Sequence, residues 1–129
     1  MQLDVVSNLF SAIYNAERVR KKECLVNPIS KFSGNILRIL QKEGYVGEFE
    51  YIDDNRGGKF RIQLLGRVNK CGAIRPRFPV GVSDLIDHAK RLLPSRDIGI
   101  IIISTPLGLM THRECLEKNV GGVLIGYVY

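Results

Sequence analysis

The sequence predicts a small protein of the α/β class, in the α+β arrangement. An amino-terminal α-β-α-β-β unit is expected to pack against a carboxy-terminal, mainly antiparallel β unit with short helices. Apolar residues recur at helical spacing in several stretches, and between these lie shorter stretches that alternate in polarity or are apolar throughout. At 129 residues, 45% of them hydrophobic, the chain is long enough for one domain or for two very small domains that share an interface.

The first predicted element is a helix over residues 3–16. Leu3, Val6, Phe10 and Ile13 recur there at helical spacing.

A short strand and a second helix are expected next. The segment ECLVNP is typical of a strand that ends at Pro28. Ser30 suits the N-cap of the following helix, and Gly44 suits the position after its last turn. The apolar face between them consists of Phe32, Ile36, Leu37 and Leu40.

Two alternating segments, YVGEFEYI and KFRIQLLG, flank the turn sequence DDNRGG and predict a β-hairpin. The adjacent carboxylates Asp53 and Asp54 could suggest acid–base chemistry, but beside two glycines they are typical of turn formers. Gly66 closes the hairpin. We therefore expect an amino-terminal domain over residues 1–66 and a carboxy-terminal domain over residues 67–129, packed as one compact unit because no linker separates them.

The second half begins with the basic segment RVNKCGAIRPRFPV, whose prolines favour an extended or looped path. The segment SDLIDHAKRLLP predicts a short helix that is capped by Ser83 and ended by Pro94. The segment DIGIIIIST predicts a buried strand, since four isoleucines follow one another in it.

The sequence THRE predicts a capping box at the start of the last helix. Thr111 would accept from the backbone of Glu114, and Glu114 would reach back to the backbone of Thr111. Met110 is placed to pack on Cys115. After a pair of glycines, VLIGYVY predicts the final strand, in which the alternating tyrosines are expected to serve packing rather than base stacking.

The charge distribution favours a polyanionic partner. The net charge is +6 and the isoelectric point is near 9.4. Between Asn55 and Ser83 there is no acidic residue. The seven basic residues of this window are Arg56, Lys59, Arg61, Arg67, Lys70, Arg75 and Arg77. Nucleic acid is the commonest partner of such a patch, and an ordinary solvated face is the alternative.

Several classes of protein are disfavoured. No stretch approaches the about 18 apolar residues of a membrane span, and the first residues lack a signal peptide's basic region, so we expect an intracellular protein without a membrane partner. Cys24, Cys71 and Cys115 are too widely spaced for a disulfide framework. They could form a zinc site with His112, but small buried side chains are the simpler interpretation.

No catalytic motif is found in the sequence. It contains no nucleophile elbow, no phosphate-binding loop of the Walker type and no zinc-protease helix. A pairing of Ser104 with His112 is the remaining catalytic alternative. We therefore expect a protein that is not an enzyme and needs no cofactor.

Ser104 and Thr105 lie where the isoleucine strand ends, just before a turn at residues 106–108. Valine would continue a strand better, whereas a hydroxyl group can both donate and accept a hydrogen bond. RNA helices are recognised through irregular pairs, the shallow groove and 2′-hydroxyls, for which such groups are suited. Plain polarity at the end of a strand is the alternative interpretation.

Several motifs follow one another along the whole chain, namely IYNAERV, PISK, EGYVGEFEYIDD, KCGAIRPRFPV, LLPSRDIGIIIISTPLGLMTH and GGVLIGYVY. With these motifs the chain resembles the family of the universal eighth protein of the small ribosomal subunit, in its archaeal and eukaryotic form. Their order and spacing together carry the resemblance, because none of them is specific alone.

The resemblance implies a structural ribosomal protein in the cytoplasm that binds an irregular helix in the central domain of small-subunit rRNA and helps to assemble it. It implies that the loop with Ser104, Thr105 and Gly108 meets the distorted base pairs, supported by Gly121 and Gly122. The amino-terminal RNA-binding candidates that it implies are Asn15 and Lys31. To these the basic segment adds Lys70, Arg75 and Arg77. Neighbouring ribosomal proteins are the other implied partners.

The loop departs from the family pattern at two positions. Many members carry a hydroxyl and then another polar residue where this chain has Pro106 and Leu107. Proline has neither a hydroxyl nor a backbone N–H, so any contact made through this position elsewhere is in doubt here. We expect a stiffer loop with a larger apolar contact.

Two other functions remain open at this point. A basic assembly scaffold whose main partner is protein would bind RNA weakly and without preference for a helix defect. A translational repressor would bind an mRNA that mimics the rRNA site.

Overall fold

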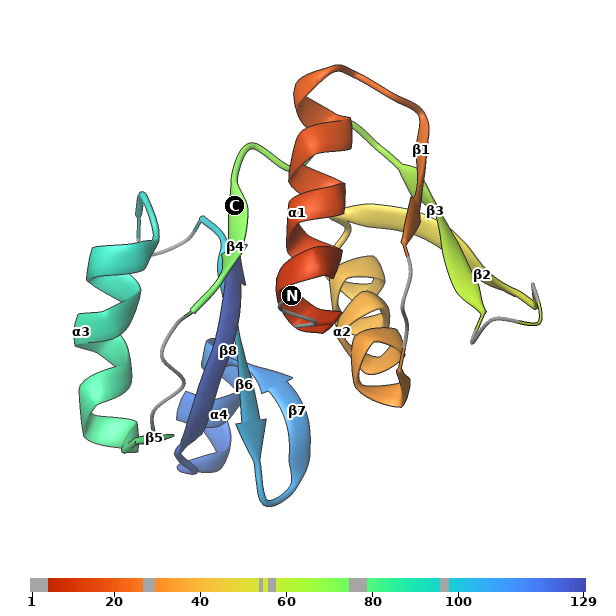
Figure 1. Ribbon diagram of the computed structural model, residues 1–129. Coiled ribbons are helices and arrows are strands. Elements are labelled where there is room, and N and C mark those ends of the chain that lie inside the picture. Colours follow the sequence, from red (N-terminus) through yellow and green to blue (C-terminus); the bar gives the residue numbers. More distant parts are fainter. Residues whose placement is uncertain (1–4, 27–29, 54, 56–57, 75–78, 96–97) are drawn as a thin grey trace. The chain divides into compact units, whose positions relative to one another are not determined.

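The computed structural model describes residues 5–26, 30–53, 55, 58–74, 79–95 and 98–129 (Figure 1). The chain divides into two compact units, Met1–Cys71 and Gly72–Tyr129. Within the described residues lie four helices and eight strands whose pairings are antiparallel, and this confirms the predicted fold class. The division after Gly66 that the sequence suggested stays a prediction.

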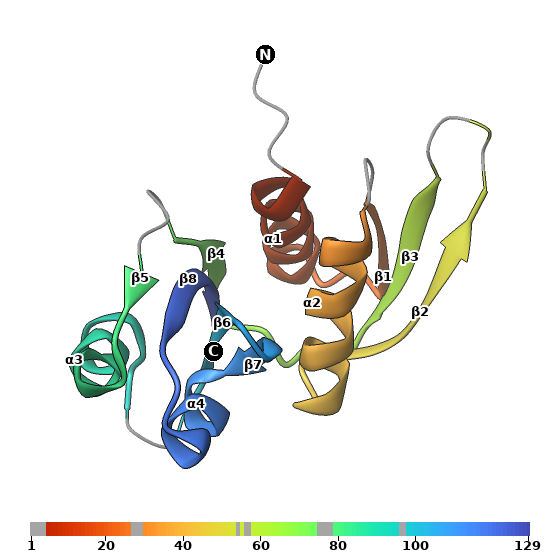
Figure 2. The ribbon, with the colours of Figure 1, turned by 90° about the horizontal axis from the view of Figure 1, so that it is seen from below.

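The first unit is a three-stranded sheet with two helices on one face (Figures 1 and 2). The strand order is β1-β3-β2, with β1 at Glu23–Val26, β3 at Lys59–Leu64 and β2 at Val46–Ile52. The helices are α1, Val5–Arg18, and α2, Lys31–Lys42. The apolar side chains expected on their inner faces are buried, except Leu3, which lies outside the described residues, and Phe32, which is half-buried.

Both ends of α2 follow from local chemistry. Ser30 is the N-cap and accepts a hydrogen bond from the N–H of Ser33 at 3.2 Å, while the Ser33 hydroxyl accepts from the N–H of Ser30 at 2.8 Å. Beyond the C-cap, Gly44 adopts φ +83°, which favours glycine. The predicted cap and stop of this helix are confirmed.

The β2–β3 hairpin is also confirmed. Glu50 and Arg61 lie directly opposite each other in its register. Asp53 acts as a turn former, because its carboxylate accepts from the N–H of Asn55 at 3.0 Å. Asp54 lies outside the described residues.

The second unit is a sheet of order β4-β8-β6-β7, with β5 paired to β8. Its strands are β4, Cys71–Ala73; β5, Pro79–Val80; β6, Ile100–Thr105; β7, Gly108–Thr111; and β8, Gly122–Val128. Its helices are α3, Val82–Leu92, and α4, His112–Lys118. The core cluster joins Ile101 and Ile103 of β6 to Leu85 of α3 and Cys115 of α4. Met110 belongs to the same cluster, in agreement with its expected packing.

Two predicted details of this unit are wrong. The N-cap of α3 is Gly81 rather than Ser83, because the N–H of Asp84 already bonds to the carbonyl of Gly81 at 3.1 Å and Ser83 falls inside the first turn. At α4 the N-cap Thr111 accepts from the N–H of Glu114 at 3.3 Å as expected, but the return contact differs. The Glu114 carboxylate accepts from the Thr111 hydroxyl at 3.5 Å.

Three short strands, β4, β5 and β7, were not predicted. β4 and β5 lie within the basic segment, for which an extended path was expected, and β7 follows directly on the turn after β6. Each is stabilised by pairing with a longer strand far along the chain or across a turn, which its own residue pattern does not reveal.

Candidate nucleic-acid interface

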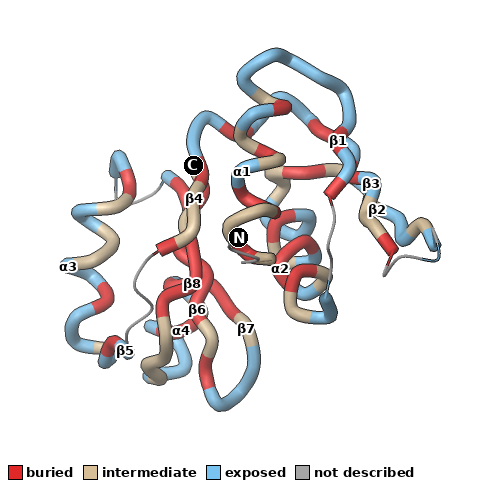
Figure 3. Tube along the Cα trace, in the orientation of Figure 1, coloured by how far each residue is buried: buried red, intermediate tan, exposed pale blue. Residues whose placement is uncertain are grey.

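The candidate interface is the turn between β6 and β7 together with the start of β8. Thr105 and Gly108 pair across the hairpin, so that only Pro106 and Leu107 form its loop. The β6 strand is buried except at the half-buried Ser104, and the turn is exposed, as Figure 3 shows by the change from mainly red to pale blue. Leu107 is 66% exposed. The turn is a narrow projection with an apolar tip.

The hydroxyl of Thr105 stabilises this turn. It donates to the carbonyl of Gly108 at 2.8 Å and accepts from the N–H of Leu107 at 3.1 Å. Its single proton is therefore used within the protein, and toward another molecule Thr105 can only accept. At 8% exposure it is the less accessible of the two hydroxyl residues.

Ser104 is half-buried and lies near the end of β6. It pairs with Leu109 of β7 on one side and with Val123 of β8 on the other. No hydrogen bond to its hydroxyl is found among the described residues, and the side chain is reachable from outside. Of the two hydroxyls, this one keeps both its donor and its acceptors for a partner.

The glycine pair brings β8 close to its neighbours. A Cβ atom on Gly122 would clash with the carbonyl oxygen of Ser104, and one on Gly121 would lie 2.5 Å from the carbonyl oxygen of Val80. Both obstacles are backbone atoms, which cannot move aside cheaply. The expected supporting role thus has a physical basis, since Gly122 allows β8 to approach the backbone of Ser104 and Gly121 allows it to approach the backbone of Val80.

Gly108 differs from that pair. It adopts φ +116°, and no atom lies within 4 Å of the position that a Cβ would occupy. Its backbone is therefore open to the close approach of another molecule.

The other candidate residues belong to the first unit or lie outside the described residues. Asn15 on α1 and Lys31 at the start of α2 are exposed in the first unit. Lys70 is exposed just before β4, whereas Arg75 and Arg77 lie outside the described residues. Within the second unit, the structure brings together five of the candidates at the hairpin end, namely Ser104, Thr105, Gly108, Gly121 and Gly122.

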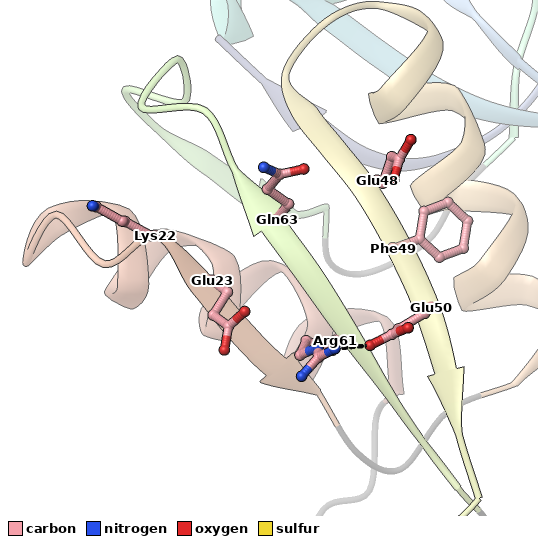
Figure 4. Close-up of a pocket in the computed structure, with 7 residues that line it drawn as sticks. All are labelled: Lys22, Glu23, Glu48, Phe49, Glu50, Arg61 and Gln63. Carbon is pink, nitrogen blue, oxygen red and sulfur yellow. Dashed lines mark ion pairs between the residues drawn. The ribbon is translucent and has the colours of Figure 1, made fainter.

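Part of the basic window is already neutralised. Arg61 forms an ion pair with Glu50 on the adjacent strand, beside a surface hollow that also contains Glu23 and Glu48 (Figure 4). The acid-free window of the sequence is therefore not acid-free in space, because strand pairing brings a carboxylate to Arg61.

His112 has a structural role in the strand. Its Nδ1 accepts from the N–H of Ile101 at 3.1 Å, and it is 4% exposed. Burial, and after it the charge of Arg113, lowers the pKa of His112 to about 4, so the ring is neutral near pH 7. With Nδ1 occupied in this way, a pairing of Ser104 with His112 has no support in the geometry.

The three cysteines are buried, as the sequence suggested. Burial is the first cause that raises the pKa of Cys24 to about 11, that of Cys71 to about 12, and that of Cys115 above its usual value. The Cys71 thiol donates to the carbonyl of Phe10 at 3.3 Å. Such thiols stay protonated and are poor nucleophiles and metal ligands. No cluster of metal-binding side chains is found within the part of the chain that the structure describes.

None of the helices in the described segments is long and apolar enough to cross a membrane.

Comparison with known proteins gives a consistent result over the whole chain. The profile of the family described as "Ribosomal protein S8" matches residues 4–129. A relative from Metallosphaera sedula is 52% identical over 130 residues, which cover 98% of each chain. One from Desulfurococcus amylolyticus is 55% identical over 130 residues, again 98% of each chain. One from Aeropyrum pernix is 52% identical over 132 residues, covering 100% of this chain and 99% of its own. Each of the three is described as "Small ribosomal subunit protein uS8".

Proposed function

Because the chain belongs to the ribosomal protein S8 family, we propose that it is a structural constituent of the small ribosomal subunit and binds small-subunit rRNA directly. The proposed target is an irregular helix in the central domain of that RNA, whose assembly the protein assists. It acts within cytoplasmic ribosomes, next to other small-subunit proteins. The role is structural rather than enzymatic.

The observation that carries this proposal is the β6–β7 turn. It projects a stiff, two-residue loop from a buried strand, with the Ser104 hydroxyl beside it and open space over Gly108. An irregular RNA helix exposes base edges and 2′-hydroxyls that require both donors and acceptors, and Ser104 supplies both. Thr105 holds the turn in shape and offers an acceptor only. Leu107 adds an apolar contact at the tip.

The basic residues supply affinity in this scheme. Lys70, Arg75 and Arg77 are proposed to contact phosphates of the RNA, and Asn15 and Lys31 to contact neighbouring RNA. Contacts to phosphates position a protein on RNA but carry no sequence information, and they make binding depend on salt. Specificity therefore rests on the turn.

Binding to two RNA hairpins of equal length tests the function. One hairpin contains an internal irregularity, and the other is perfectly paired. We expect tighter binding to the irregular hairpin at every salt concentration, with a similar salt dependence for both, because the phosphate contacts are common to them. Equal affinity for the two hairpins would contradict direct recognition of an irregular helix and would favour a basic scaffold whose main partner is protein.

An mRNA that carries the same irregular structure would bind through the same turn. Repression of translation by this route uses no residue beyond those already named, and competition between the two RNAs for one site would reveal it.

A further inference from the structure

A groove of about 640 Å³ opens between α3 and α4 in the second unit. Its walls are mainly aliphatic, and their residues include Ile86 and Leu93 on one side and Leu116 on the other. Ile86 is 52% exposed and Leu116 is 37% exposed. Aliphatic side chains left in water around one concave surface mark a place that another molecule covers.

The polar groups of the groove are all suited to an anion. Lys90 and Arg113 line it and are exposed, and of the described lining residues none is acidic. His112 also lines it. Because its Nδ1 accepts from Ile101, the neutral ring carries its proton on Nε2, and no other hydrogen bond to the ring is found within the described segments. The ring edge away from the strand thus offers one donor toward the groove.

The groove and the β6–β7 turn lie at opposite ends of the same strand. His112 bonds to Ile101 near the start of β6, whereas the turn follows Thr105 at its end. Strands rise about 3.3 Å per residue, so the two places are separated by about 13 Å along β6. The groove is therefore a place on the second unit distinct from the turn.

We propose that the α3–α4 groove is the docking site for a segment of a neighbouring protein that presents aliphatic side chains and a carboxylate. The aliphatic side chains would cover Ile86 and Leu116, and the carboxylate would pair with Lys90 or Arg113 and accept from His112. Nucleic acid fits less well, because the one aromatic ring among the described lining residues is that of His112, which at 4% exposure offers little face on which a base could stack. Since the neighbour is taken to be a protein of the small subunit, this inference rests on the proposed function.

Photo-cross-linking within purified small subunits tests the proposal. The tagged chain carries Leu116→p-benzoylphenylalanine, and a second version carries the same amino acid in place of Leu107 at the hairpin tip. From position 116 we expect cross-links to one protein segment that contains aliphatic residues and an aspartate or glutamate. From position 107 we expect cross-links to rRNA. The version with p-benzoylphenylalanine at position 107 thus serves as the control that RNA cross-links are detected when they form in small subunits.

Charge reversal identifies the role of the groove's cations. Arg113→Glu should reduce the cross-link from position 116 at least tenfold. The matched control is Lys118→Glu, which changes an exposed lysine of the same helix that does not line the groove, and it should leave the yield unchanged.

Cross-links from position 116 to rRNA, to no other molecule, or in equal yield in the Arg113→Glu variant would each overturn the docking proposal alone. Absence of the tagged wild-type chain from the small-subunit fraction would instead overturn the proposed function, and with it the identity of the neighbour.

Discussion

His112 makes the stability of the folded chain depend on pH in the range just below neutrality. The ring is 4% exposed and accepts a hydrogen bond at Nδ1, and its pKa falls from the ordinary 6.5 to about 4. Between these two values the unfolded chain binds a proton that the folded chain does not. The contribution of the neutral, buried His112 ring to the free energy of unfolding is therefore complete above about pH 6.5, and it is lost as the pH falls toward 4.

The expected magnitude follows from the same values. At about 1.4 kcal/mol per pH unit, the full difference amounts to roughly 3 kcal/mol, and about 2 kcal/mol of it is lost at pH 5. We expect the free energy of unfolding of the wild type to fall by about this amount between pH 7.5 and pH 5. His112→Asn should be less stable at pH 7.5, since the ring leaves a cavity, but should lack most of this pH dependence because its amide oxygen replaces Nδ1 without titrating.

Urea denaturation followed by circular dichroism, at several pH values from 7.5 to 5, measures how the free energy of unfolding depends on pH in the wild type and in His112→Asn. The background variant His88→Gln leaves His112 as the only histidine of the chain, so that its ring can also be titrated by NMR. The reasoning would be refuted if the free energy of unfolding depended on pH equally in the wild type and in His112→Asn, or if NMR gave His112 a pKa near 6.5.

Three further substitutions test the interface. Gly122→Ala places a methyl group against the carbonyl of Ser104 and should lower the free energy of unfolding by about 1–3 kcal/mol, measured by denaturation; an unchanged value would contradict the close strand approach. Gly108→Ala should weaken binding to the irregular hairpin. Gly66→Ala should not, although Gly66 also has positive φ and open space around the added methyl group, and an equal loss of affinity in the two variants would indicate backbone strain instead of a lost RNA contact. Lys70→Gln should weaken binding to both hairpins alike and reduce the salt slope by about 1, and an unchanged slope would mean that Lys70 contacts no phosphate.

Much of the fold could be predicted because the information is local. The helical spacing that ends at Ile13, the cap at Ser30 and the stop at Gly44 act through neighbouring residues only. The missed strands are different. The strand at Gly108–Thr111 exists because it pairs with β6 across a two-residue turn. A segment of four residues is too short to show the alternation of polar and apolar residues that marks a strand in sequence.

The candidate site was only partly predictable for a similar reason. Sequence and resemblance together selected Ser104, Thr105 and the glycines, but nothing local distinguishes the two hydroxyls. Only the fold places the Thr105 hydroxyl inside the turn and leaves Ser104 accessible. Likewise, Arg61 lies in an acid-free window of the sequence, but strand pairing brings Glu50 to it as an ion-pair partner. The α3–α4 groove had no sequence signal, since its walls come from two helices that are amphipathic in the ordinary way.

The most direct measurement of the central idea, that the β6–β7 turn reads an irregular RNA helix, is the affinity of Ser104→Ala for the two hairpins. This change removes one hydroxyl with almost no change of shape and removes no charge. If Ser104 meets a base edge or a 2′-hydroxyl, binding to the irregular hairpin should weaken by about 1–3 kcal/mol, roughly 5- to 150-fold. Binding to the paired hairpin and the salt slope of both should remain as in the wild type. Wild-type affinity of Ser104→Ala for the irregular hairpin would contradict the idea and would place recognition in the basic segment.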